Sequence, residues 1–177
     1  MNLTKPFYIN GYQTKFLTNC DLELLQDLLE RSADYYKLVT GLPPNPSDAQ
    51  RLFEDVPKGK LAQDKILIGI YSSPDRLIGV LDAVRNHPSL GNWWLGLLLI
   101  DPLYRRKGLG EEIISAFENW VVEFGAKDIY LGVVEENHRA LQFWQKIGFE
   151  IIDKRPPKKS GNLSQVVIVM KRRINRE

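Results

Sequence analysis

The fold of this chain is decided by residues 97–110, which read Leu-Leu-Leu-Ile-Asp-Pro-Leu-Tyr-Arg-Arg-Lys-Gly-Leu-Gly. The stretch begins as an apolar strand, is broken at Pro102 and continues through a basic turn that contains two glycines. Apolar residues recur at three- and four-residue spacing from Ile113 onward, which predicts an amphipathic helix directly after Gly110. A strand, a basic glycine turn and a helix therefore follow one another closely.

This succession predicts an anion site at the start of the helix. The first N–H groups of a helix have no internal partner and lie at the positive end of its dipole, so they can bind a phosphate. Gly108 and Gly110 allow close approach of the backbone. The spacing is neither that of a Walker A loop nor that of the dinucleotide fingerprint G-x-G-x-x-G. A basic turn without a ligand is the alternative interpretation.

The pattern Arg105-x-x-Gly108-x-Gly110 resembles the pyrophosphate-binding signature R/Q-x-x-G-x-G/A of the GNAT superfamily of acyl-CoA-dependent N-acetyltransferases. A second block, residues 137–149, reads Asn-His-Arg-Ala-Leu-Gln-Phe-Trp-Gln-Lys-Ile-Gly-Phe. It is similar to the family pattern N-x-x-A-x-x-F-Y-x-x-x-G-F, which closes the acyl-CoA site. The two blocks stand in the order and at the separation usual for the family, so the chain is interpreted as a GNAT member.

The resemblance implies a mixed α/β fold, the GNAT acyl-CoA N-acyltransferase fold, in a single domain of residues 1–177. Its sheet would be mostly antiparallel and seven-stranded, with a splayed parallel pair and about four helices. The resemblance also implies acetyl-CoA as co-substrate and no metal. The residues that it assigns to acetyl-CoA are Leu98, Leu99, Ile100, Arg105, Arg106, Lys107, Gly108, Leu109, Gly110, Asn137, Phe143 and Trp144.

Hydrophobic patterning predicts strands and helices along the rest of the chain. Residues 65–73 and 77–84 are expected to form a hairpin, because a tight Ser-Pro-Asp-Arg turn separates two apolar runs. The proline-rich residues 156–162 are expected to form an exposed connection. The other predicted strands lie at 7–16, 93–100, 128–135, 149–155 and 166–170, and the helices at 22–29, 33–41, 47–53, 113–124 and 137–147.

The implied reaction is direct attack of a primary amine on a thioester, which requires a base to remove a proton from the amine. Asp82 interrupts an apolar strand, and a carboxylate there needs either a partner or a chemical role. We therefore predict Asp82 as the first candidate base and Glu135 as the second. Both have an alternative interpretation as ion-pair partners.

The general acid is left open by the sequence. The family usually has a tyrosine where this chain has Trp144, and an indole does not titrate in the useful range. Either the thiolate leaves without protonation, or a tyrosine from elsewhere supplies the proton. Tyr35 and Tyr36 are candidates for substrate contact and for this role, with half-buried core packing as the alternative; Tyr104 and Tyr130 are two further candidates for the acid.

Composition restricts the classes of partner. Of 177 residues, 44% are hydrophobic and 26% charged, and the net charge of +2 gives no general attraction to nucleic acid or to an anionic membrane. One cysteine and two scattered histidines provide neither a disulfide framework nor a metal cluster. The start of the chain lacks the apolar region of a signal peptide, and the apolar runs are too short to span a bilayer, so a cytoplasmic location is expected.

The function expected from the sequence is transfer of an acetyl group from acetyl-CoA to a small-molecule or peptide amine. The alternative is a non-catalytic acyl-CoA-binding sensor or regulatory module on the same fold, which the tryptophan at 144 favours. The identity of the acceptor and the oligomeric state, a homodimer included, are open at this stage.

Overall fold

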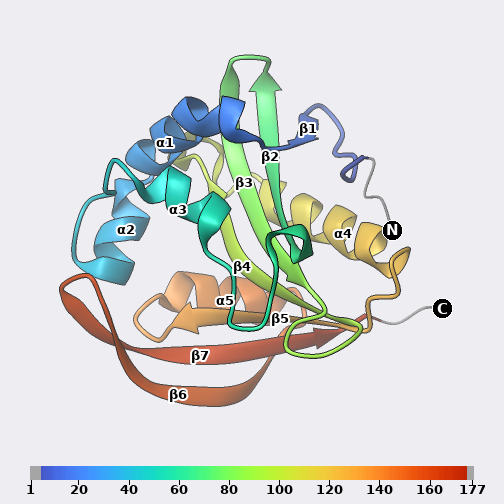
Figure 1. Cartoon of the computed structure of the whole chain (residues 1–177). Helices are drawn as coiled ribbons and strands as arrows, with labels where there is room; N and C mark the ends of the chain where they lie inside the picture. The colour runs from blue at the N-terminus through green and yellow to red at the C-terminus, as the bar shows by residue number, and fades with distance from the viewer. Residues whose placement is uncertain (1–4, 175–177) are drawn as a thin grey trace.

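The computed structural model of the protein describes residues 5–174, and these form a seven-stranded sheet in the order β1-β2-β3-β4-β5-β7-β6 (Figure 1). Neighbouring strands are antiparallel except β4 and β5, which are parallel. The predicted mixed α/β fold is thereby confirmed. The strands are β1 (Gln13–Phe16), β2 (Lys65–Ser73), β3 (Arg76–Arg85), β4 (Asn92–Ile100), β5 (Asp128–Val134), β6 (Glu150–Ser160) and β7 (Leu163–Arg173).

The described residues contain five α-helices, one more than the resemblance implied but at the places that the hydrophobic pattern predicted, and three short ones lie between β1 and β2. Ser32 separates the first two of these, and Gly41, in the left-handed conformation, ends the second. None of the helices within residues 5–174 has the length and apolar character needed to cross a bilayer. The helices are α1 (Leu22–Arg31), α2 (Ala33–Thr40), α3 (Asp48–Glu54), α4 (Leu109–Val122) and α5 (His138–Lys146).

Two apolar layers sandwich the sheet. On one face, α4 buries the stripe predicted from its spacing, including Ile113, Phe117 and Val121, together with Trp144 of α5. On the other face, α1 buries Leu25, Leu28 and Leu29 against β2 and β3, while α2 and α3 pack alongside (Figure 1). Both faces of β3 are therefore covered.

The sheet opens between β4 and β5. Their ladder runs only from the pair Asn92–Asp128 to the pair Leu95–Leu131, although both strands continue beyond it. Gly96 follows at once and has no partner in β3, which makes it the extra residue of a β-bulge. The bulge turns the rest of β4 away from β5, and the two strands splay as the family resemblance implied.

The second half of the sheet departs from the sequence prediction at one place. Residues 156–162 were expected to be a connection, but β6 continues through Pro156 and Pro157 to Ser160. Prolines are tolerated there because β6 is an edge strand and needs no outward N–H donor. Its register against β7 shifts between Arg155 and Lys158, where the two prolines lie.

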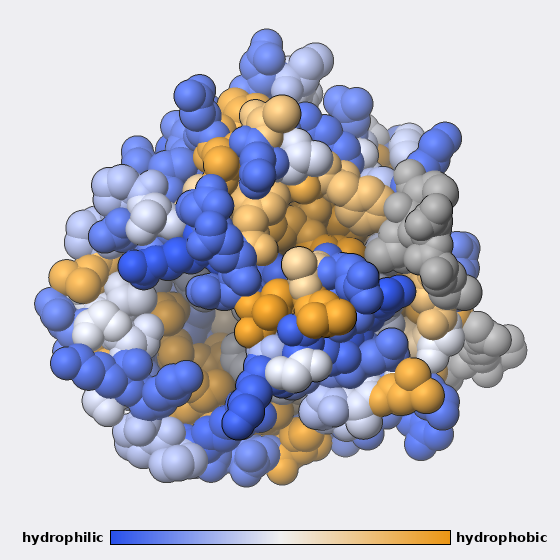
Figure 2. All heavy atoms as spheres, in the orientation of Figure 1, coloured by the Kyte–Doolittle hydropathy of each residue, from blue (hydrophilic) through white to orange (hydrophobic). Residues whose placement is uncertain are grey.

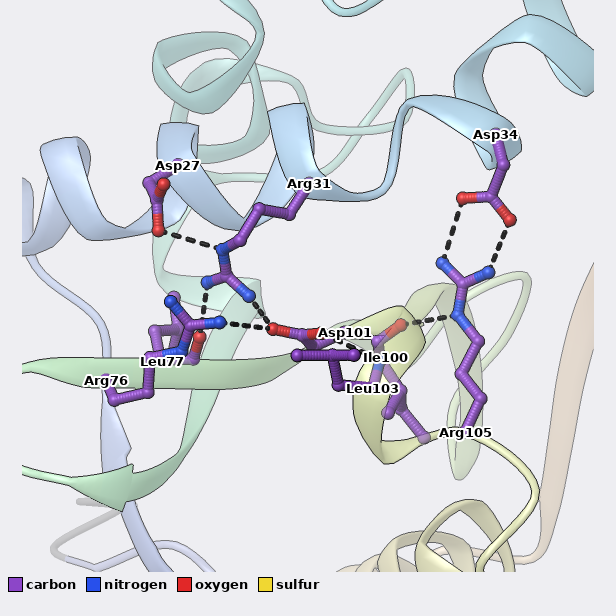
Figure 3. A network of polar contacts seen from close by, with 9 residues as sticks. All are labelled: Asp27, Arg31, Asp34, Arg76, Leu77, Ile100, Asp101, Leu103 and Arg105. Atoms are coloured by element: carbon purple, nitrogen blue, oxygen red, sulfur yellow. Dashed lines mark hydrogen bonds and ion pairs between the residues drawn. The ribbon is translucent and has the colours of Figure 1, made fainter.

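The end of β4 is held by a buried carboxylate. Asp101 is only 1% exposed and forms ion pairs with Arg31 of α1 and Arg76 of β3 (Figure 3). Its Oδ1 accepts a hydrogen bond of 2.9 Å from Leu103 N, and its N–H donates to Ile78 O at 2.8 Å. Asp101 therefore joins α1, β3 and the start of the basic turn.

Replacement of Asp101 should destabilise the fold. In Asp101→Asn, two guanidinium groups lose their shared counter-charge, so we expect the free energy of unfolding to fall by about 3 kcal/mol. Urea unfolding measures the change. Asp27→Asn is the matched control, because Asp27 pairs with the same Arg31 but from the surface, and it should cost less than about 1 kcal/mol. Equal losses in the two variants would contradict a special role for Asp101.

Candidate active site

A cleft of about 570 Å³ lies where β4 and β5 diverge. Its walls come from the end of β4, the basic turn, α5 and α2, and it contains the residues predicted to bind acetyl-CoA except Lys107 and Leu109. Leu109 is the first residue of α4, and its side chain is buried in the core. In the space-filling view, a hollow between the α2 and β7 regions shows hydrophobic residues below a hydrophilic rim (Figure 2).

The basic turn has the geometry of an anion site. Arg106 and Gly108 both adopt the left-handed conformation, with φ of 60° and 86°, and such turns direct successive N–H groups into a concavity. Within α4, Glu111 and Glu112 are the first donors, and both bond to Gly108 O. The N–H groups of the preceding helical residues have no intrahelical acceptor, so they are available to an anionic ligand.

Gly110 leaves space at the base of the cleft. A Cβ atom built on this residue would lie 3.2 Å from the Phe143 ring, closer than such contacts normally are. Helix α4 and helix α5 therefore approach each other closely at the point where the free amides are exposed. A glycine cradle and free amides fit a phosphate group, as the sequence motif predicts.

Arg105 does not point its charge freely into this cradle. Its guanidinium forms two hydrogen bonds with Asp34 of α2, and its Nε donates to Ile100 O at 2.7 Å (Figure 3). The guanidinium also lowers the pKa of Asp34. Arg105 thus connects α2 to the end of β4 and forms a wall of the cleft.

Arg139, in the first turn of α5, is another cation of the cleft, and it was not predicted from the sequence. Arg139 is exposed and has no ion-pair partner in the part of the chain that the structure describes. Its position, two residues after the helix cap Asn137, is the sequence feature that could have indicated a cation in the cleft. Its guanidinium is free to meet an anionic ligand in the cleft.

The α5 wall combines a cap with an aromatic cluster. Asn137 Oδ1 accepts a hydrogen bond of 3.1 Å from Ala140 N, so Asn137 caps the start of α5. The Trp144 indole is buried and contacts the rings of Phe143 and Phe149, with centroids 4.9 and 5.1 Å away. Position 144 therefore contributes packing as well as cleft lining.

Two tyrosines of α2 stand between this cleft and a second cavity. Tyr35 lines the cleft and Tyr36 lines the second cavity, and their rings meet edge to face with centroids 5.7 Å apart. Burial raises the pKa of both phenols, so both remain protonated hydrogen-bond donors at neutral pH. Tyr104 and Tyr130 line neither cavity.

The second cavity has a volume of about 460 Å³ and lies on the face of the sheet that α1, α2 and α3 cover. It reaches β4 at Gly96, the bulge residue. The cleft reaches β4 at Leu98, two residues further along the strand. The two cavities therefore approach the same part of β4. The remaining charged and aromatic lining residues of the second cavity are Asp48, Arg51, Asp55, Lys65, Asp82 and Trp94.

Asp82 is the buried carboxylate of the second cavity. It is 7% exposed, and its Oδ2 lies 3.3 Å from Lys65 Nζ, whereas its Oδ1 has no hydrogen-bond partner within residues 5–174. Burial raises the pKa of Asp82 to about 6, although Lys65 opposes this shift. A Cβ on Gly96 would lie 3.0 Å from Oδ2, which places the carboxylate against the bulge.

Glu135, the second candidate base, lies just beyond β5 and forms an ion pair of 2.6 Å with Lys154 of β6. It lines neither the cleft nor the second cavity. The structure thus brings Asp82, Tyr35 and Tyr36 near one another and leaves Glu135 apart. No group of three or more His, Cys, Asp or Glu side chains in the described residues could hold a metal ion.

Comparison with known proteins agrees with this architecture. Residues 24–149 match the family model described as the acetyltransferase (GNAT) family, and the chain belongs to that family. A spermine/spermidine N(1)-acetyltransferase of Bacillus subtilis (strain 168) is 30% identical over 88 residues, which are 47% of this chain and 58% of that protein. The chain therefore matches little more than half the length of this curated relative.

Solved structures share the fold. An acetyltransferase from Thermus thermophilus superposes with a TM-score of 0.74 at 21% identity, covering 92% of this chain and 96% of that one. The spermidine N-acetyltransferase from Vibrio cholerae, in complex with CoA and spermine, has a TM-score of 0.71 at 17% identity, with 94% and 97% covered. At these identities the similarity establishes the fold.

Replacement of Gly110 should weaken binding of acetyl-CoA. In Gly110→Glu, a carboxylate would enter the anion cradle and a Cβ would press on Phe143, so we expect the dissociation constant to rise at least tenfold, a loss of about 1.4 kcal/mol or more. Calorimetric titration measures it. Gly110→Ala separates the steric part from the charge.

Ser115→Glu is the charge control for this experiment, because it adds the same carboxylate to an exposed position of the same helix. Its affinity for acetyl-CoA should match that of the unaltered protein. If Gly110→Glu also binds normally, the turn is not the phosphate site.

Proposed function

We propose that this protein transfers an acetyl group from acetyl-CoA to a primary amine of a small molecule, by direct attack within a ternary complex. The observation that carries the proposal is the approach of two cavities to the same part of β4. The cleft carries an anion site, and the second cavity carries a buried carboxylate at the bulge. Membership of the acetyltransferase family supports this assignment.

The cleft is the proposed site for acetyl-CoA, which supplies an activated thioester. The N–H groups at the start of α4 would hold its pyrophosphate, assisted by Arg106 and Arg139. The backbone of Leu98 to Ile100, which is unpaired on the β5 side, would hydrogen-bond its extended arm. Phe143 and Trp144 would cover the opposite side of that arm.

Asp82 is the proposed base. An amine is mostly protonated at neutral pH, and it becomes a nucleophile only when a proton is removed. A carboxyl with a pKa of about 6 is largely ionised at pH 7, yet it is a stronger base than an ordinary aspartate. Its Oδ2, which lies against the bulge at Gly96, is the proposed acceptor of the proton.

Tyr35 is the proposed proton donor to the departing sulfur. It lines the same cleft as Trp144, the position at which the family usually has a tyrosine, and its pKa is raised by burial, so the phenol stays protonated. A thiol has an ordinary pKa near about 8.5, so a hydrogen bond from a phenol is sufficient help for its departure.

The second cavity is the proposed site of the amine acceptor. Its carboxylates Asp48, Asp55 and Asp82 outnumber its cations Arg51 and Lys65, so it favours a cationic guest. The curated relative is named for spermine and spermidine, and a fold relative was solved with spermine. We therefore propose small aliphatic amines, polyamines first, as the acceptors to be tested.

The first experiment is a calorimetric titration with acetyl-CoA, with adenosine diphosphate as the control for simple nucleotide binding. Saturable binding specific for acetyl-CoA, followed by amine-dependent release of free thiol, would support the proposal. If acetyl-CoA binds but none of the amines causes thiol release, the result would favour the non-catalytic sensor. Trp144, which stands where the family usually has a tyrosine, is consistent with that alternative. Absence of binding would overturn both functions.

Asp82→Asn should retain acetyl-CoA binding and lower kcat by about 10²- to 10⁴-fold, because the amide cannot accept the proton. The unaltered enzyme should show kcat/KM rising with pH below about 6 and levelling above it, since only the ionised carboxyl is a base. Steady-state rates between about pH 5 and 9 measure both.

Asp55→Asn is the matched control for Asp82, because it removes a carboxylate from the same cavity at an exposed position. It should preserve most of kcat, and because the charge of Asp55 raises the pKa of Asp82, its removal should move the acid limb of the profile toward lower pH. An Asp82→Asn enzyme with full kcat would show that another group is the base.

Tyr35→Phe should lower kcat with acetyl-CoA while leaving the dissociation constant of acetyl-CoA within about twofold, because only the phenol oxygen is lost. We expect a loss of about tenfold or more. Tyr36→Phe is the neighbouring control, since that phenol lines the other cavity. A larger loss of kcat in Tyr36→Phe than in Tyr35→Phe would show that Tyr36, and not Tyr35, is the proton donor.

A further inference from the structure

Lys65 is a cation whose side chain is buried, and burial of a charge is unfavourable in free energy. Its side chain is 6% exposed at the first position of β2. The ammonium donates a hydrogen bond of 2.6 Å to Asp55 O and lies 3.3 Å from Asp82 Oδ2. A lysine withdrawn from water to this extent is expensive unless its charge is paired.

The other charged groups around Asp82 do not replace this pairing. Asp55 follows α3 and carries the same charge as Asp82, so its field opposes ionisation of the buried carboxyl. Within the cavity, Arg51 pairs with Asp48 at 3.6 Å, and Tyr36 of α2 is uncharged. Lys65 is therefore the cation that acts directly on Asp82.

The contact is made with one carboxylate oxygen. Lys65 lies near Oδ2, while Oδ1 has no hydrogen-bond partner among the described residues. Oδ1 is enclosed by the protein, so Oδ2, which lies near Lys65 and against Gly96, is the oxygen at the bulge. The carboxylate plane is thus set by a residue that lines the same cavity as the proposed acceptor site.

We propose that Lys65 is the positioning residue of the proposed transfer, holding the Asp82 carboxylate through Oδ2 against the bulge at Gly96, so that this carboxylate receives the proton of the attacking amine. The inference rests on the proposed function. In the step, the N–H bond of the amine breaks, its proton passes to the Asp82 carboxylate, and the nitrogen electron pair forms the new bond to the acyl carbon. The carbon–sulfur bond then breaks, and CoA leaves as a thiolate that accepts a hydrogen bond from Tyr35.

A purely structural role is the competing explanation. Lys65 also satisfies Asp55 O at the end of α3, and loss of that bond alone could loosen the cavity. The two roles differ in what they predict for the proton affinity of Asp82. Burial raises the pKa of Asp82 and Lys65 lowers it, so removal of the ammonium should raise it further.

The test uses Lys65→Met and Lys65→Arg in the full chain. In Lys65→Met, the acid limb of the kcat/KM profile should move up by about one pH unit or more, with kcat at pH 7 reduced at least about tenfold. Lys65→Arg retains a charge and should keep the limb near its original place. Lys60→Met is the control, because Lys60 pairs instead with Asp64, at 3.9 Å.

Further measurements distinguish a positioning role of Lys65 from a folding defect in the variant. Titration of the Asp82 carboxyl carbon by NMR, without substrate, should show the same upward shift in Lys65→Met. In a double-mutant cycle, Lys65→Met should change kcat little once Asp82→Asn is present, because the lysine acts through the carboxylate. Urea unfolding establishes that each variant is folded under the assay conditions.

The outcomes distinguish failure of the positioning role of Lys65 from failure of the proposed function. An unmoved NMR titration, or the same loss of kcat in both backgrounds, would overturn the role of Lys65. If Asp82→Asn retained full activity, the base assignment would fail and the role of Lys65 with it. If acetyl-CoA did not bind, the proposed function would fail at the cleft, which Lys65 does not line.

Discussion

The loss of pairing between β4 and β5 is the constraint on which the rest of the structure depends. After Leu95 and Leu131 the two strands continue without sharing hydrogen bonds, so backbone groups that a closed sheet would satisfy are left open. The bulge at Gly96 makes this divergence, and the residue must be small because Asp82 lies against it. A single irregularity thereby creates an opening for an extended ligand and places a carboxylate beside it.

Because β4 and β5 share no hydrogen bonds beyond Leu95 and Leu131, other contacts must fix the end of β4. The end of β4 is fixed by Asp101, which pairs with arginines of α1 and β3 inside the protein. Arg105 adds a second connection, joining Ile100 O to Asp34 of α2 (Figure 3). These contacts replace the missing ladder, and they secure α1 and α2 above the same opening. The rigidity of the cleft therefore depends on side chains more than on backbone pairing.

Local patterns in the sequence were sufficient for the fold and for most of the cleft. The glycine turn, the helix after it and the cap at Asn137 each depend on neighbours within a few residues, which a pattern can represent. Contacts between distant segments could not be predicted in this way. Arg105 meets Asp34 across 71 positions of sequence, and Lys65 meets Asp82 only because β2 and β3 pair in one register. Strand β6 continued through two prolines because its place at the edge, a property of the whole sheet, permits them.

The tryptophan at 144 gains a physical meaning from this arrangement. Its indole packs between two phenylalanines, so the position belongs to the core as much as to the cleft. The proposed proton donor comes from another wall, because α2 contributes Tyr35 to the same cleft, next to Tyr36 in the second cavity. The proposed base and the proposed proton donor consequently come from β3 and α2 and line different cavities that approach the same stretch of β4. In the proposed reaction, the amine would lose its proton in the second cavity while the sulfur would accept a hydrogen bond in the cleft.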